Sequence, residues 1–212
     1  MKKILSLMIV SVMLVMALTS CEYVDQLMNL IPEEEGVRYT VTEEEWNNML
    51  EMQNHTLTII RNVKSISNGE TLSMDYDFLI KQNETSGYNQ QGASPGSYYV
   101  IEGDKSYLLQ NIGGDSFRVI ESTWKPIRFD VYLERDFVNS LDDLTYDEEK
   151  KAYCYHINES GTLIDYEFYF EDGKIVKAIY NFKMDNGGSV NMTINVSDIG
   201  TTVIDVPEFT VE

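Results

Sequence analysis

The chain has 212 residues, of which 43% are hydrophobic and 11% aromatic, which is enough apolar material for the core of one globular domain or two small ones. Its formal net charge of −19 repels nucleic acid, so DNA and RNA are excluded as partners. The only two cysteines, Cys21 and Cys154, are too few for a disulfide scaffold.

The first twenty residues have the pattern of a secretory signal. Lys2 and Lys3 form a positive start, and residues 4–18 form an apolar run that is interrupted only by two serines. A permanent helix across a bilayer needs about twenty residues. This run is shorter and small residues follow it, so it predicts a cleavable signal peptide over residues 1–20.

The residues that end this run, Leu18-Thr19-Ser20-Cys21, resemble the lipobox of bacterial lipoproteins at all four positions. The resemblance implies that Cys21 receives a diacylglycerol on its thiol and that the signal is cut just before it. It also implies a location in the bacterial cell envelope, outside the cytoplasm, with a membrane as partner through the acyl chains. Two or three chains hold a protein on a membrane for long times, because each buried methylene contributes about 0.8 kcal/mol. The alternative is a chance cysteine beside an ordinary cleavage site.

Residues 21–36 are predicted to form the acylated cysteine and an acidic tether. The segment 32–36 combines a proline, three glutamates and a glycine, and this composition breaks helices and stays in solvent. The remaining residues, 37–212, are predicted to form a single antiparallel-sheet domain.

A helix is predicted over residues 42–52, at the start of this domain. Thr42 and Glu45 have the spacing of a capping box, and the three acids in the first turn suit the helix dipole. The apolar residues that share one face at helical spacing are Trp46, Met49 and Leu50. We expect Trp46 to lie in the core.

The clearest strand covers residues 70–81, where apolar and polar residues alternate. Its apolar set is Leu72, Met74, Tyr76, Phe78 and Ile80. Period-two alternation predicts one dry and one wet face. Shorter strands are predicted at residues 55–63, 97–102, 106–110 and 117–121, and the polar stretch 87–96 is predicted to be a loop.

A second helix is predicted near residues 129–141. Phe129, Leu133, Phe137 and Leu141 recur every four residues there. A hairpin is expected next, over residues 144–157. Cys154 lies in its second strand and is interpreted as a small buried hydrophobe.

The C-terminal third predicts a meander of three strands. Its turns carry Asp172-Gly173 and Asn186-Gly187, which favour tight hairpins. The inward-facing sets are Ile164, Tyr166, Phe168 and Phe170, then Val176, Ala178, Tyr180, Phe182 and Met184, then Val190, Met192, Ile194 and Val196. A last short strand is expected near residues 202–206. A sheet with a single apolar face needs another layer to cover it.

The sequence contains no catalytic or metal-binding constellation, so we predict no enzyme activity, no cofactor and no metal. His55 and His156 do not share a metal-ligand spacing. Cys154 and His156 fall on one face of a strand, but a zinc site needs three or four ligands. The fourteen tyrosines are good strand formers, and they can also form a contact surface.

Together these elements predict an α+β fold, a curved antiparallel sheet or half-barrel that is covered on its apolar face by one or two helices. This arrangement is similar to the half-barrel lipoproteins of the LolA/LppX-like superfamily. The features that carry the resemblance over residues 37–212, besides the lipobox, are the helix with Trp46, Tyr153-Cys154-Tyr155, Asp172-Gly173-Lys174, and Asp198 to Thr201 followed by Pro207. Members of that superfamily bind lipids or lipidated proteins between sheet and helices. The resemblance transfers no individual cargo-binding residue.

The leading hypothesis is a non-catalytic, lipid-anchored protein that binds a hydrophobic ligand. The residues predicted to line its cavity are Met74, Tyr76, Phe78, Tyr166, Phe168, Tyr180 and Phe182. The same residues can instead pack against the helices and leave no cavity. The second hypothesis is a cell-surface module that binds a protein or glycan through exposed tyrosines, without an internal ligand. Ligand identity and oligomeric state stay open.

Overall fold

The structure is a computed structural model, and it describes residues 38–211 apart from residues 68, 134–137 and 139. The predicted signal peptide, Cys21 and the tether lie outside the described residues. Among the described residues are the helix α2 (Glu43–Glu51) and two short 3-10 turns, η1 (Phe129–Tyr132) and η2 (Leu141–Asp143). The strands are β1 (His55–Ser67), β2 (Glu70–Gln82), β3 (Ser86–Gln91), β4 (Ser97–Glu102), β5 (Lys105–Gly113), β6 (Ser116–Ser122), β7 (Thr145–Asp147), β8 (Ala152–Glu159), β9 (Thr162–Glu171), β10 (Lys174–Lys183) and β11 (Ser189–Ser197).

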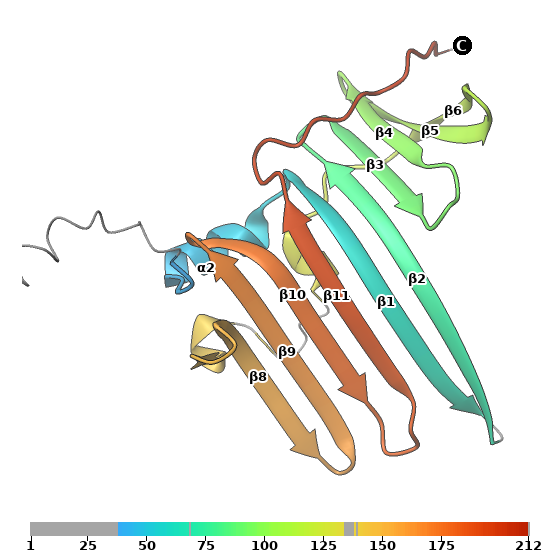
Figure 1. Cartoon of the computed structure of the whole chain (residues 1–212). Coiled ribbons are helices and arrows are strands. Elements are labelled where there is room, and N and C mark those ends of the chain that lie inside the picture. The colour runs from blue at the N-terminus through green and yellow to red at the C-terminus, as the bar shows by residue number, and fades with distance from the viewer. Residues whose placement is uncertain (1–37, 68, 134–137, 139, 212) are drawn as a thin grey trace, which may run out of the picture. The chain divides into compact units, whose positions relative to one another are not determined.

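The eleven strands form one open, curved antiparallel sheet in the order β6-β5-β4-β3-β2-β1-β11-β10-β9-β8-β7 (Figure 1). Neighbours in the sheet are also neighbours in the chain, except at the centre, where β1 pairs with β11 and Ile59 lies opposite Ile194. The sheet therefore consists of two meanders, β1–β6 and β7–β11, which are joined through their first and last strands. The edge strands are β6 and β7.

The helix α2 begins where the capping box predicts. The Thr42 hydroxyl accepts a hydrogen bond from the Glu45 amide at 3.2 Å, and Glu45 Oε2 accepts one from the Thr42 amide at 2.8 Å. A cap of this kind stabilises a helix by about 1 kcal/mol. The buried residues of α2 are Trp46, Met49 and Leu50, so the predicted helix and its core-facing side are confirmed.

The face of the sheet against which α2 packs is called the inner face. Cross-strand pairing places Phe168, Ala178, Ile194, Ile59 and Phe78 side by side on this face, one on each of five adjacent strands. The Trp46 ring lies edge-on to Phe168, with ring centroids 5.2 Å apart. The main core thus lies between the inner face and the segments that cover it, which are α2 and residues of the connection from β6 to β7.

A second apolar cluster lies on the opposite, outer face of the same sheet. Ile80 is on the inner face, so its neighbour Lys81 is on the outer face, and the pairing then continues through Tyr88, Tyr98 and Leu109. The members of this cluster are Val100, Tyr107 and Leu109, with Tyr98, Phe117, Val119, Val206 and Phe209 packed against them. The apolar side of the sheet therefore changes between β2 and β3, and the C-terminal segment covers the new side.

The second predicted helix, over residues 129–141, is wrong for the residues that the structure describes. Two 3-10 turns, η1 and η2, stand near the ends of this range. Ser140 is the N-cap residue of η2, and its amide donates a hydrogen bond to Asp143 Oδ2 at 2.9 Å, so a new turn starts inside the predicted helix. Val138, which lies off the predicted apolar stripe, is fully buried.

Two other local predictions are also corrected. The predicted loop over residues 87–96 contains most of β3, because β2 offers this polar segment a partner along Phe78–Gln82. The strand expected near residues 202–206 does not form. Both edges of β11 are already paired, with β1 and β10, so the chain that follows has no free edge of β11 to join. Across the described ranges, no helix is both long and apolar enough to cross a membrane.

Candidate functional site

The seven residues predicted to bind a ligand all lie on the inner face. They stand on β2 (Met74, Tyr76, Phe78), β9 (Tyr166, Phe168) and β10 (Tyr180, Phe182). Tyr166 and Tyr180 are cross-strand neighbours with ring centroids 4.9 Å apart. Along β2 and β10 the aromatic rings stack in pairs, Tyr76 on Phe78 at 6.2 Å and Tyr180 on Phe182 at 6.5 Å. The face therefore carries two aromatic groups, on β2 and on β9–β10, which are separated by the non-aromatic inner-face residues of β1 and β11.

One end of this surface is covered and filled. Tyr166 and Phe168 are each only 1% exposed. Leu133, from the connection that follows η1, packs over them, and the space that these side chains enclose is too small to admit a water molecule. Between these residues the interior is packed, and it offers a ligand no room without movement of the cover.

The other end of the surface is open to solvent. Leu72 is 58% and Met74 37% exposed, although both lie on the same face of β2 as the half-buried Tyr76 and Phe78. Leu72, Met74 and Tyr76 together are called the open strip. The prediction of one dry face along the whole of residues 70–81 is thus wrong at this end, because the described covering segments pack only over the other end.

A cation lies in the same surface. Arg61 is on the inner face of β1, half-buried, and it pairs across the sheet with Tyr76 on one side and Met192 on the other. A guanidinium is a strong donor to carboxylate or phosphate oxygens. Arg61 was not among the predicted site residues, although it is the one charge in the alternating apolar positions from Leu57 to Val63.

The two histidines do not form a site together. His55 is fully buried, and neither ring nitrogen has a hydrogen-bond partner among the described residues. Its ring packs against Phe129 at 5.7 Å and Tyr132 at 5.9 Å, and desolvation lowers its pKa to about 4. His156 lies on the outer face and hydrogen-bonds to Asp165.

Cys154 is half-buried on the outer face of β8, rather than fully buried as predicted. Burial raises the pKa of its thiol, so the thiolate that would be the reactive form is disfavoured. No group of three or more His, Cys, Asp and Glu side chains within the described ranges is arranged to hold a metal ion.

The tyrosines lie on both faces of the sheet but do not project freely into solvent. Tyr98 is part of the outer cluster, whereas its neighbour Tyr99 stacks on Trp124 with ring centroids 5.4 Å apart. Every tyrosine in the described part of the chain is buried or half-buried. The predicted surface of exposed tyrosines is therefore not present among these residues.

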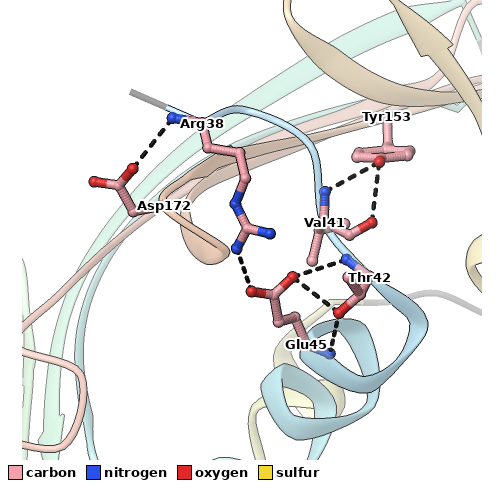
Figure 2. A network of polar contacts seen from close by, with 6 residues as sticks. All are labelled: Arg38, Val41, Thr42, Glu45, Tyr153 and Asp172. Carbon is pink, nitrogen blue, oxygen red and sulfur yellow. Dashed lines mark hydrogen bonds and ion pairs between the residues drawn. The ribbon is translucent and has the colours of Figure 1, made fainter. Parts of the chain in front are cut away.

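A polar network holds the start of the described chain against the covered end (Figure 2). The Arg38 amide donates to Asp172 Oδ1 at 3.1 Å, and its guanidinium pairs with Glu45. The Val41 amide donates to the Tyr153 hydroxyl at 3.1 Å. Hydrogen bonds from Thr42, and then from Arg38, lower the pKa of Glu45. The segment in front of α2 is thereby joined to the β9–β10 turn.

Comparison with known proteins finds similarity only at the level of solved structures. No family model and no curated protein matches the chain. A LolA superfamily protein from Nitrosomonas europaea is 10% identical with a TM-score of 0.25, over 78% of this chain and 93% of that chain. A putative outer membrane lipoprotein-sorting protein domain from Vibrio parahaemolyticus is 10% identical with a TM-score of 0.21, over 73% of this chain and 88% of that chain.

Proposed function

We propose that this protein is a non-catalytic, lipid-anchored protein of the bacterial cell envelope that binds a hydrophobic ligand on the open strip. One observation carries the proposal. The inner face that forms the core under α2 continues beyond its cover, where Leu72 and Met74 are 58% and 37% exposed. Contiguous apolar surface of this kind on a soluble domain marks a binding site.

The free energy available from covering the open strip suits an acyl chain or a similar apolar group. Fully burying a Leu or Met side chain contributes about 1.5–3 kcal/mol, so covering the exposed parts of Leu72 and Met74 contributes on the order of 2 kcal/mol. Each methylene of the ligand adds about 0.8 kcal/mol. The ligand lies on the strip rather than inside a closed cavity, since the space under Leu133 is filled.

Arg61 supports a ligand that also carries an acidic group. Its side chain stands beside Tyr76 in the row next to Met74. An acidic head group at Arg61 and an apolar chain along Met74 and Leu72 match the order of residues on this surface. The ligand class is therefore a lipid or a lipidated molecule.

The membrane anchor is tested separately from the ligand. With Cys21 as the acylated residue, the wild-type chain partitions with the membrane fraction, whereas Cys21→Ser is recovered in the soluble fraction. If the Cys21→Ser chain is processed like the wild type and stays as firmly with the membrane fraction, Cys21 is not the membrane anchor.

Ligand binding is tested with the chain from residue 21 onward, produced as Cys21→Ser so that no acyl chain is attached. Native mass spectrometry with lipid extraction is expected to detect co-purified lipid. The double variant Leu72→Gln with Met74→Gln is expected to weaken binding about tenfold or more, since 1.4 kcal/mol corresponds to a factor of ten. Loss of lipid without loss of the circular dichroism spectrum assigns the effect to the strip.

The matched control is Ile60→Gln. Ile60 is 52% exposed on β1, but it faces outward, opposite Asp77 on β2. The Ile60→Gln substitution therefore removes an exposed apolar side chain from the outer face of β1, beside β2, and leaves the open strip unchanged. If Ile60→Gln reduces lipid binding as much as the double variant, the open strip is not the site.

The filled interior under Leu133 favours a second candidate, a module that binds a partner protein or glycan without any internal ligand. The partner would contact the same inner face, because the tyrosines of the described residues do not form an exposed patch. Absence of extractable lipid from the purified chain, together with binding of a protein or glycan that Leu72→Gln with Met74→Gln abolishes, would replace the first candidate by this one.

A further inference from the structure

An open groove of about 580 Å³ lies at the far edge of the sheet from β7, outside the surface described above. One wall is formed by β6, and the other by residues 208–211 of the C-terminal segment. Tyr107, Phe117 and Val119 belong to the apolar outer-face cluster and also line the groove. The groove thus combines an apolar base with a strand along its side.

The backbone beside this groove is available for pairing. β6 is the last strand of the sheet, with β5 as its neighbour on one side only. Phe117 and Arg118 are adjacent in β6 and point to opposite faces, yet both line the groove, so the groove borders the strand edge as well as the outer face. Over the ranges that the structure describes, residues 203–211 make no backbone–backbone hydrogen bond.

The negative charge of the groove favours a positively charged partner. Its lining contains three carboxylates, from Asp115, Glu121 and Glu208, against the single guanidinium of Arg118. Lys105 pairs with Glu121 at 3.0 Å, but both side chains are more than half exposed. Such exposed pairs contribute little and separate readily.

We propose that this groove binds an extended peptide segment of a partner protein as a strand added to β6, in which apolar residues and a Lys or Arg occupy every second position and so share one face. Strand addition uses the free edge for backbone hydrogen bonds, and the side chains supply specificity. Phe117, Val119 and Glu121 share the outer face of β6. Apolar side chains on this face of the peptide contact Phe117 and Val119, while a basic side chain on the same face meets Glu121 and Glu208. A second copy of this chain fits less well, because its net charge of −19 repels an acidic groove.

The test uses a labelled peptide, Thr-Lys-Thr-Val-Thr-Val-Thr, in which the Lys and both Val share one face, and the full chain from residue 21 onward carrying Cys21→Ser. Fluorescence anisotropy is expected to report saturable binding. A peptide with Glu in place of Lys, and one with Pro in place of the central Val, are each expected to bind at least tenfold more weakly. The second loss is expected because Pro removes an amide donor and disfavours an added strand. Amide exchange of β6, measured by NMR, is expected to slow at least tenfold on binding.

Variants of the protein separate the groove from general charge attraction. Glu121→Lys with Glu208→Lys reverses two exposed groove charges and is expected to weaken binding at least tenfold. Glu159→Lys reverses an exposed charge at the end of β8, outside the groove lining, and is expected to change binding less than twofold. The proposal is overturned by equal binding of the Pro peptide, by unchanged exchange in β6, by equal effects of the two sets of variants, or by no binding at millimolar peptide.

Discussion

The burial of His55 predicts a pH-dependent stability that a single substitution removes. Its side chain is fully buried between β1 and η1, and desolvation lowers its pKa to about 4 from the ordinary 6.5. The unfolded chain therefore binds a proton as the pH falls through 6.5, while the folded chain does not until about pH 4. The folded state is thus fully favoured above pH 6.5 and loses free energy as the pH falls towards 4.

The magnitude follows from the two pKa values. One pKa unit corresponds to 1.36 kcal/mol, so the whole shift amounts to about 3 kcal/mol, of which about 2 kcal/mol is lost between pH 7 and pH 5. Tyr132, which contacts the His55 ring, stays neutral over this range, since even the ordinary tyrosine pKa of 10 lies above it and burial raises the pKa of Tyr132 further, to about 12. The pKa of Glu45 is lowered. The stability that its ionised carboxylate contributes to the folded state is therefore lost only as the pH falls below the ordinary pKa of a glutamate.

Urea unfolding at pH 7 and pH 5 measures this effect. The wild-type chain is expected to lose about 2 kcal/mol of unfolding free energy between these values, whereas His55→Leu, which cannot be protonated, is expected to lose almost none. His156→Asn is the control, because His156 is exposed on the outer face, and it should behave like the wild type. If His55→Leu and the wild type lose equal stability, the buried imidazole is not the group responsible.

Two further predictions concern the covered end of the sheet. Trp46→Ala is expected to lower the unfolding free energy, measured in urea, by about 3–5 kcal/mol, because it leaves a cavity beside Phe168 in the core. A loss below 1 kcal/mol would mean that α2 does not stabilise this part of the core. Gly173→Ala is expected to lower the unfolding free energy by about 1 kcal/mol more than Gly103→Ala does. Both glycines have positive φ, 73° and 60°, but an added Cβ collides with Glu45 and Arg38 only at Gly173. Equal losses for the two glycine variants would show that the network in Figure 2 contributes nothing.

The features that the sequence alone predicts correctly depend on neighbouring residues. The Thr42–Glu45 capping box starts α2 because both partners lie within one turn. The Asp172-Gly173 turn joins β9 to β10 because both residues adopt positive φ. Period-two alternation also assigns all seven predicted ligand residues to one face, since successive side chains of a strand point to opposite sides.

The tertiary structure decides what lies opposite each of these surfaces. Met74 and Phe78 belong to the same alternating run, but the described cover reaches Phe78 and leaves Met74 exposed. Polar residues 86–91 become a strand because β2 has a free edge beside them, and residues 202–206 do not, because both edges of β11 are taken. Local patterns set which way a side chain points, whereas burial and strand pairing depend on segments distant in the chain. The signal peptide, Cys21 and the tether are sequence predictions outside the described residues. The sequence also predicts Met74 and Tyr76 as ligand residues, but the exposure of the open strip and the β6 groove appear only in the three-dimensional arrangement, because both depend on which distant segments cover a strand.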